Sequence, residues 1–174
     1  MRILIWLLGL LVFGTPQLAR AEIVVAFYSH DLDVGFKTDF PHAFIVVKGE
    51  TADGRHVDTN YGFTAKSVSP AVLMGSVAGT METLPVSYYK KSVRQFAVKI
   101  SDGQYDALLS VVEKWQAVKG KSYNLDKRNC IHFVGDAAQA LGLKVILEKK
   151  LIKKPVAFMQ SLIALNPWVK PATP

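Results

Sequence analysis

The sequence predicts an α+β domain in which strands come first and helices follow. Short apolar runs bounded by polar and turn-forming residues occupy the chain up to residue 100, a pattern typical of strands. Beyond residue 101, apolar side chains recur every three or four residues, which is the spacing of an amphipathic helix. A run of strands followed by a run of helices indicates an antiparallel sheet packed against helices.

Four segments have the apolar pattern of strands, and the third of them alternates strictly. In that segment His56, Asp58 and Asn60 share one face, because successive side chains of a strand point to opposite sides. The glycine-bounded stretch 49–54 joins it to the strand before, which predicts an antiparallel hairpin. The four expected strands are residues 23–28, 43–47, 55–61 and 92–100.

Two amphipathic helices are expected after the strands. The first spans residues 102–118. The second begins at Cys130 and has Asn129 as its N-cap, since a side-chain oxygen at that position accepts a hydrogen bond from a free backbone N–H. Residues 144–165 are expected to add a strand and a further helix, with a proline in the first turn of that helix.

Residues 1–21 have the pattern of a secretory signal peptide. Arg2 precedes an apolar run over residues 3–13, and Ala19-Arg20-Ala21 stands before Glu22 as a small-x-small cleavage site. The run is short for a membrane span, although an uncleaved anchor is the alternative. Cleavage leaves 153 residues, 22–174, enough for one domain with a core, and predicts a periplasmic or secreted protein.

The charge of the chain favours anionic partners. Without residues 1–21, 19 basic and 14 acidic side chains remain, a net charge of +5. This excess suits a cell-wall polymer or an anionic envelope surface. The lysines are scattered along the chain, which argues against nucleic acid as the partner. The sequence identifies no partner protein.

Cys130 is the only cysteine in the chain, so it cannot form an internal disulfide. An unpaired cysteine in a secreted protein indicates a reactive thiol. The free N–H groups and the positive dipole end at a helix N-terminus favour the thiolate form. Helical spacing also places Cys130 on the apolar stripe of its helix, so the thiol is expected to face the sheet.

A thiolate nucleophile needs a base, and the chain has four histidines, His30, His42, His56 and His132. His132 is two residues from Cys130, which on a helix turns it away from the cysteine. His30 lies in a polar loop that nothing in the sequence places near the helix. His42 stands at the start of an apolar strand, and its pairing with the cysteine makes it the candidate base.

Two segments carry a family resemblance: His42 to Gly49, and Asn129-Cys130-Ile131-His132-Phe133-Val134. They resemble the circularly permuted papain-like thiol hydrolases, the NlpC-like branch that includes lecithin–retinol acyltransferase-like proteins. Members have a strand-borne histidine followed much later by Asn-Cys-x-His-Phe at a helix start, whereas ordinary papain-like enzymes place the cysteine first. The similarity covers residues 23–143 and departs at Ile131, where the motif often carries an acidic residue.

The resemblance implies a permuted papain-like fold and a thiol-hydrolase mechanism. Cys130 would attack a carbonyl carbon, while His42 accepts the thiol proton and later protonates the leaving group. The backbone N–H of Cys130 and a neighbouring donor would stabilise the oxyanion. Tyr123 is expected either to line the cleft or to serve as a packing aromatic.

A third polar residue should hold the imidazole in the correct tautomer. If the hairpin loop is centred near Thr51, Asn60 lies opposite His42. A register shift of two residues brings Asp58 there instead, and a shift of four brings His56. We favour Asn60 as the third catalytic residue.

Cys130 has two other interpretations, as a metal ligand and as a packed core residue. Cys130, His42 and His56 could bind zinc, but the chain has no close ligand pair such as Cys-x-x-Cys, so we expect neither a metal nor another cofactor. A catalytically silent envelope-binding domain with a packed Cys130 is the second. The resemblance and the signal sequence favour a secreted cysteine hydrolase that cleaves amide bonds in peptidoglycan stem peptides. The alternative is a lipid-directed thiol esterase or acyltransferase with an acyl-lipid substrate.

Overall fold

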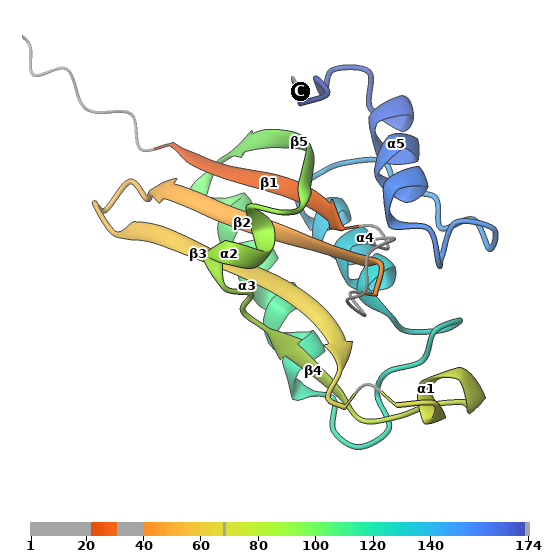
Figure 1. Ribbon diagram of the computed structural model, residues 1–174. Helices are drawn as coiled ribbons and strands as arrows, with labels where there is room; N and C mark the ends of the chain where they lie inside the picture. The colour runs from red at the N-terminus through yellow and green to blue at the C-terminus, as the bar shows by residue number, and fades with distance from the viewer. Residues whose placement is uncertain (1–21, 31–39, 68, 173–174) are drawn as a thin grey trace, which may run out of the picture.

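The computed structural model describes residues 22–30, 40–67 and 69–172; the expected signal peptide, residues 1–21, lies outside them. The described chain is α+β, with an antiparallel sheet and helices, which confirms the predicted fold class (Figure 1). The strands are β1 (Ile23–His30), β2 (His42–Glu50), β3 (His56–Ala65), β4 (Gly79–Glu82) and β5 (Val93–Ile100). The helices are α1 (Ala71–Met74), α2 (Val86–Tyr89), α3 (Asp102–Ala117), α4 (Cys130–Ala140) and α5 (Pro155–Leu165).

The five strands form one sheet in the order β4-β3-β2-β1-β5, and every neighbouring pair is antiparallel. Strand β2 lies in the middle, and its side chains are buried on both faces. Ala43, Ile45 and Val47 belong to the main core, whereas Phe44 and Val46 pack with Leu84 in a second cluster. This alternation follows from the two-residue period of a strand, and it explains why β2 is an unbroken apolar run.

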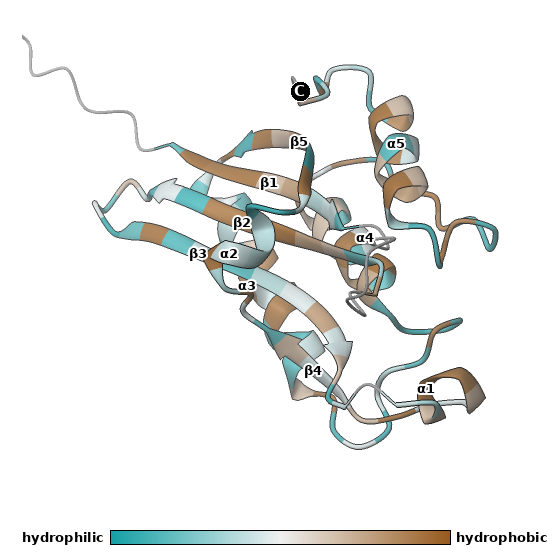
Figure 2. Cartoon of the chain, in the orientation of Figure 1, coloured by the Kyte–Doolittle hydropathy of each residue, from teal (hydrophilic) through white to brown (hydrophobic). Residues whose placement is uncertain are grey.

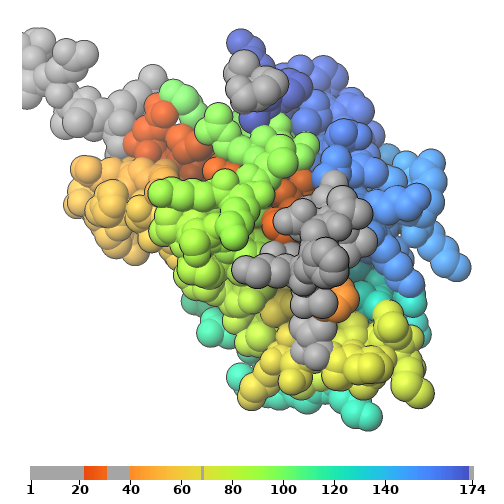
Figure 3. Space-filling model, in the orientation of Figure 1, coloured from red at the N-terminus to blue at the C-terminus, as the bar shows by residue number. Residues whose placement is uncertain are grey.

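Helices α3, α4 and α5 pack on one face of the sheet. Helix α4 lies against β2 and β3, α5 lies against β1 and β5, and α3 packs on α4. Figure 2 shows apolar residues along β1 and β2 and through α5, where these layers meet. The opposite face is covered in part by α2, and the green segment that contains this helix lies over the strands in Figure 3. The main core therefore lies between the sheet and the three long helices.

The β2–β3 hairpin forms as expected, but its predicted register is wrong by four residues. Ile45 pairs with Tyr61 and Val46 pairs with Asn60, so the loop is centred at residue 53 rather than 51. The turn spans Thr51 to Arg55, whose backbones are hydrogen bonded at 3.0 Å. Gly54 takes the positive φ of 82° that this turn needs, a conformation that glycine adopts without strain.

The remaining expectations were met in part. The expected helices 102–118 and 130–141 correspond to α3 and α4, and α5 begins with a proline at its first position. The strand expected in the region before α5 is absent, since residues 144–154 form no strand. The sequence reasoning missed α1, β4 and α2, each of which has only four residues. Such lengths leave too few residues for a periodic pattern.

No helix in the described part of the chain has both the length and the apolar character needed to cross a bilayer.

Asn129 makes the start of α4 a well-defined point in the fold. Its Oδ1 accepts hydrogen bonds from the N–H groups of Ile131 and His132, at 2.9 and 3.3 Å. Its Nδ2 donates to the carbonyl oxygens of Leu125 and Ile152, at 2.7 and 2.6 Å. The buried side chain therefore caps the helix and ties it to two loops at once.

Two replacements of Asn129 are expected to destabilise the protein to different extents. Asn129→Asp keeps the capping oxygen but loses both donated bonds, whereas Asn129→Ala loses all four and should cost about 3 kcal/mol in free energy of unfolding. Urea denaturation of both variants measures these losses. Equal stability of Asn129→Ala and the parent protein would contradict this role.

Candidate active site

Cys130 is the first residue of α4, as the sequence predicts. Its side chain is only 6% exposed and belongs to the main core between the helices and the sheet. The N–H groups of Ile131 and His132 are taken by the Asn129 cap. The cap leaves the N–H of Cys130 itself free of the Asn129 side chain, at the positive end of the helix dipole.

His42 is the first residue of β2, the strand against which α4 packs. Its side chain is 9% exposed. The ring stacks on Phe44 with centroids 5.9 Å apart and an interplanar angle of 17°, and it meets the edge of Tyr88 at 6.5 Å. These two aromatic rings hold the imidazole at the end of the sheet where the helix begins.

Glu82 is the residue that pairs with His42. It is the last residue of β4, and its Oε1 lies 3.2 Å from Nε2 of His42. Nε2 has no hydrogen bond of ordinary geometry, so the contact is an ion pair rather than a well-directed hydrogen bond. Burial alone would lower the pKa of His42, but its interactions with Cys130 and Glu82 outweigh burial and raise this pKa to about 9.

The imidazole has room on the sheet because β3 has a glycine beside it. A Cβ atom placed on Gly62 would lie 2.8 Å from Nε2 of His42 and 3.5 Å from Cγ of Glu82. Gly62 pairs with Phe44 on one side and with Glu82 on the other, so it lies directly under the contact. No larger residue fits at this position without moving the imidazole.

Tyr123 lies at the same end of the site. Burial raises the pKa of its hydroxyl, and the charges of Cys130 and Glu82 raise it further. Its ring packs against Phe63 at 5.7 Å, and its backbone pairs with Val77. The hydroxyl therefore stays protonated beside the cysteine, and Tyr123 is both a packing aromatic and a neighbour of the site.

None of the three candidates for the third catalytic residue lies beside His42. Asn60 is opposite Val46, and its amide is hydrogen bonded at both ends to the backbone of Leu84, at 3.0 and 2.6 Å. The expectation that Asn60 faces His42 is therefore wrong, because the register differs by four residues. Asp58 forms an exposed ion pair with Lys48 at 3.2 Å. His56 pairs with Glu50 at the other end of the hairpin.

His30 lies close to His42, whereas His132 faces the cap of its own helix. His30 pairs with His42 across β1 and β2, and its Nδ1 lies 3.4 Å from Oγ of Ser92. His132 is turned toward the helix cap, where its Nδ1 accepts from the N–H of Asn129 at 3.3 Å. Burial lowers the pKa of His132. The sequence argument that His132 points away from Cys130 agrees with this geometry.

The described residues contain no cluster of three histidine, cysteine or acidic side chains able to hold a metal ion. The zinc site considered for Cys130, His42 and His56 does not assemble, since His56 lies at the far end of β2 and β3.

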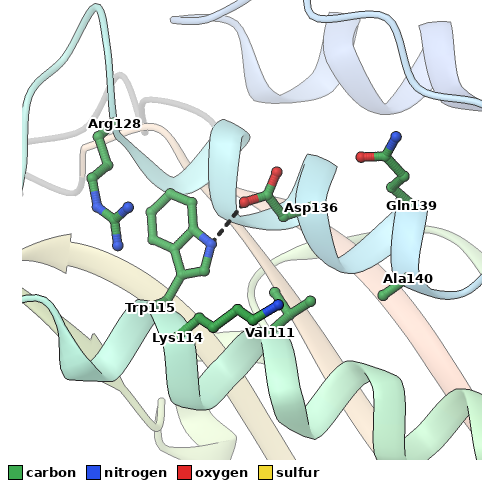
Figure 4. Close-up of a pocket in the computed structure, with 7 residues that line it drawn as sticks. All are labelled: Val111, Lys114, Trp115, Arg128, Asp136, Gln139 and Ala140. Carbon is green, nitrogen blue, oxygen red and sulfur yellow. Dashed lines mark hydrogen bonds between the residues drawn. The ribbon is translucent and has the colours of Figure 1, made fainter.

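A cavity of about 420 Å³ lies between α3 and α4, and it is separate from the Cys130–His42 site (Figure 4). The guanidinium carbon of Arg128 lies 3.8 Å from the centre of the Trp115 ring, and Nε1 of Trp115 donates to Asp136 at 2.8 Å. Because Arg128 is two residues before Cys130, these contacts hold the chain that leads into α4. The cavity is lined by Val111, Lys114, Trp115, Arg128, Asp136, Gln139 and Ala140.

Sequence reasoning missed Glu82, although the chain carries one signal for it. Glu82 is the only acidic residue between Asp58 and Asp102. A lone carboxylate in a long uncharged and basic stretch is a reasonable partner for a buried cation. Nothing in the sequence indicates which cation, because β4 is too short to be recognised as the strand beside β3.

Comparisons with known proteins support the fold. No protein-family model matches the chain, and no curated protein is significantly similar to it in sequence. Among solved structures, the type VI secretion system effector TseH superposes with a TM-score of 0.54. The match has 14% sequence identity and covers 84% of this chain and 90% of the TseH chain. This protein therefore shares its fold with a secretion-system effector.

Proposed function

We propose that this protein is a cysteine hydrolase in which Cys130 is the nucleophile, His42 the proton carrier and Glu82 the residue that positions His42. The observation that carries the proposal is the buried imidazole of His42, which interacts with both Cys130 and Glu82 and has its pKa raised to about 9. A protonated imidazole next to a thiol is the arrangement that activates cysteine nucleophiles.

The proposed reaction cleaves an amide bond in two steps. Sγ of Cys130 bonds to the carbonyl carbon, the carbon–nitrogen bond breaks, and the imidazolium of His42 gives its proton to the leaving amine. Water then attacks the thioester with neutral His42 taking its proton, and the carboxylic acid leaves as the thiol re-forms. Since Nε2 is turned to Glu82, Nδ1 is the nitrogen that serves these proton transfers.

The oxyanion formed in each step needs hydrogen-bond donors. The N–H of Cys130 lies at the start of α4 and is not used by the Asn129 side chain. The hydroxyl of Tyr123 stays protonated because burial raises its pKa. These two groups are the proposed donors.

Amide bonds of peptidoglycan stem peptides are the proposed substrate. The predicted signal peptide would direct the chain out of the cytoplasm, and the basic excess of the chain suits a negatively charged cell wall. The family resemblance, with the histidine placed before the cysteine, points to the permuted branch of papain-like hydrolases.

A lipid ester or acyl group is the second candidate substrate, and one feature of the site favours it. The face of the sheet that carries His42 has a small aromatic cluster around Phe44, in which Tyr28, Tyr88 and Tyr89 are only partly buried. Apolar surface beside the proton carrier would suit an acyl chain.

Activity on two substrates tests the proposal. Purified sacculi and acyl phospholipids are each incubated with the protein, and released peptides or fatty acids are measured by mass spectrometry. Cys130→Ala and His42→Ala should each lower the rate by about a thousandfold or more. His56→Ala removes an exposed histidine at the far end of β3 and should leave the rate unchanged. Retained activity in either site variant would refute the mechanism.

The His42–Glu82 pair predicts a pH-dependent stability. Since the pKa of folded His42 is raised from 6.5 to about 9, its protonation stabilises the fold fully below pH 6.5, and this is lost as the pH rises through 9. The full effect is about 3 kcal/mol. Glu82→Gln should remove part of this stabilisation. The free energy of unfolding that the variant loses relative to the parent protein should therefore be largest near pH 6.5 and shrink toward pH 9.

Chemical denaturation across this pH range measures the deficit. Asp58→Asn is the matched control, because it makes the same carboxylate-to-amide change on an exposed ion pair of the neighbouring strand. Its deficit should not vary over this range. A deficit in Glu82→Gln that is independent of pH would show that the carboxylate does not act through His42.

Gly62→Ala tests the position of the imidazole. The added methyl group would lie 2.8 Å from Nε2 and must displace the ring, which should lower kcat by as much as about a hundredfold while the protein stays folded. Gly103→Ala is the control, since a Cβ atom there meets no atom within 4 Å. Equal rates for the two variants would mean that the imidazole position does not control the reaction.

A further inference from the structure

The most exposed apolar side chains of the described residues belong to one short helix. In α1, Leu73 is 80% exposed and Met74 is 88% exposed. Figure 2 shows this apolar helix at the edge of the molecule, away from the sheet. Exposing two adjacent large apolar side chains to water costs free energy, and covering them with another surface recovers it. We call this pair the α1 tip.

The α1 tip is held on a defined part of the surface. Just after it, Val77 and Tyr123 exchange two backbone hydrogen bonds of 2.9 Å, and Nδ2 of Asn124 donates to Oγ of Ser76 at 3.0 Å. Before it, the N–H of Lys66 donates to the carbonyl of Ala78 at 2.8 Å. The tip is therefore anchored beside the loop that leads to Cys130, as Figure 1 shows.

Exposed lysines lie on the segments that anchor the α1 tip and on the adjoining chain, where acidic residues are few. Glu148, which precedes Lys149, is ion-paired with Lys150 at 2.8 Å. Residues 66–81 contain no aspartate or glutamate. The neighbouring loop has one, Asp126, whose pKa is lowered first by its ion pair with Lys153 at 2.6 Å and then by Lys149 and Lys127. We call the exposed lysines on this side the lysine rim: Lys66, Lys121, Lys127, Lys149 and Lys153.

We propose that the α1 tip and the lysine rim bind the surface of an anionic lipid bilayer. The apolar pair enters the boundary between headgroups and acyl chains, and the lysines contact the lipid phosphates. An anionic polymer would use the lysines but would leave Leu73 and Met74 in water. Only a surface that offers both negative charge and an apolar layer covers both features.

Docking in this way places the catalytic residues next to the bilayer. The segment after the tip leads into β4, which carries Glu82. Val77 in this segment pairs with Tyr123, which lies beside Cys130. A substrate anchored in or near the membrane would therefore reach the site. Binding itself depends on no step of the cysteine chemistry, so Cys130→Ala should bind lipid as the parent protein does.

Vesicle co-sedimentation tests the proposal. The probes are vesicles of phosphatidylcholine alone and of phosphatidylcholine mixed with phosphatidylglycerol. Every variant is produced from the full chain, and intact mass confirms a common N-terminus, so that residues 1–21 cannot cause differences. The parent protein should bind the mixed vesicles, and binding should weaken at high salt.

Two variants remove the two parts of the surface. Leu73→Ser combined with Met74→Ser should weaken binding about tenfold or more, because two apolar side chains no longer enter the bilayer. Lys121→Gln combined with Lys127→Gln should weaken it by roughly twentyfold and reduce its salt dependence. Trp168→Ser is the control, since it removes an apolar side chain that is 62% exposed elsewhere on the surface, and it should bind normally.

The outcomes are decisive either way. Equal binding to both kinds of vesicle, or unchanged binding after the Leu73 and Met74 replacements, would overturn the proposal. Loss of binding only in Cys130→Ala would also overturn it, since the surface would then depend on the catalytic site. Normal lipid binding by a protein without hydrolase activity would support the docking surface and refute the proposed chemistry.

Discussion

A histidine that is charged and buried must be paired, and His42 obtains its partners from two separate elements. Isolated charge in a protein interior costs several kcal/mol, so the imidazolium is stable only where opposite charge reaches it. Cys130 comes from the first turn of α4 and Glu82 from the end of β4. The raised pKa of His42 therefore depends on how the helix and the edge strand are placed relative to β2. Gly62 contributes by leaving space for the ring.

The position of Cys130 depends in turn on Asn129. The four hydrogen bonds of this buried amide begin α4 and fasten the preceding loop and the chain before α5 to the same point. Arg128 adds a contact on the other side by lying over the Trp115 ring, which belongs to α3. The nucleophile thus stands where three elements are tied together, which limits its freedom relative to the sheet.

The parts of the site that could be predicted are those with local signals. Cys130 was identified because a single cysteine follows a good N-cap and precedes an apolar helical stripe. His42 starts an apolar strand, but its choice as the base depends on its pairing with Cys130 and on the family resemblance. The structure places His42 at the start of a strand and Cys130 at the start of a helix, as the local patterns predict. The antiparallel sheet and the two main helices follow from equally local periodicities.

The third residue could not be predicted because it depends on pairing between distant segments. The sequence offers two glycines, Gly49 and Gly54, as starting points for the hairpin turn. In the structure Gly49 stays in β2, where an added Cβ atom would collide with the backbone of Glu22 and Ile23, and Gly54 lies in the turn. That choice depends on β1, which a hairpin argument does not include. The predicted register is wrong by four residues. It therefore places Asn60 opposite His42, whereas Asn60 pairs with Val46.

Glu82 also lies on the strand with the least support in the sheet. β4 has four residues and a single neighbour, so its backbone is held by fewer hydrogen bonds than that of any central strand. The chain before β4 carries the α1 tip and is fastened to Tyr123, which lies near both Cys130 and Glu82. The chain that carries the tip therefore runs directly into the strand that holds the Glu82 carboxylate. One short segment of chain connects the exposed surface to the strand that supplies the partner of His42.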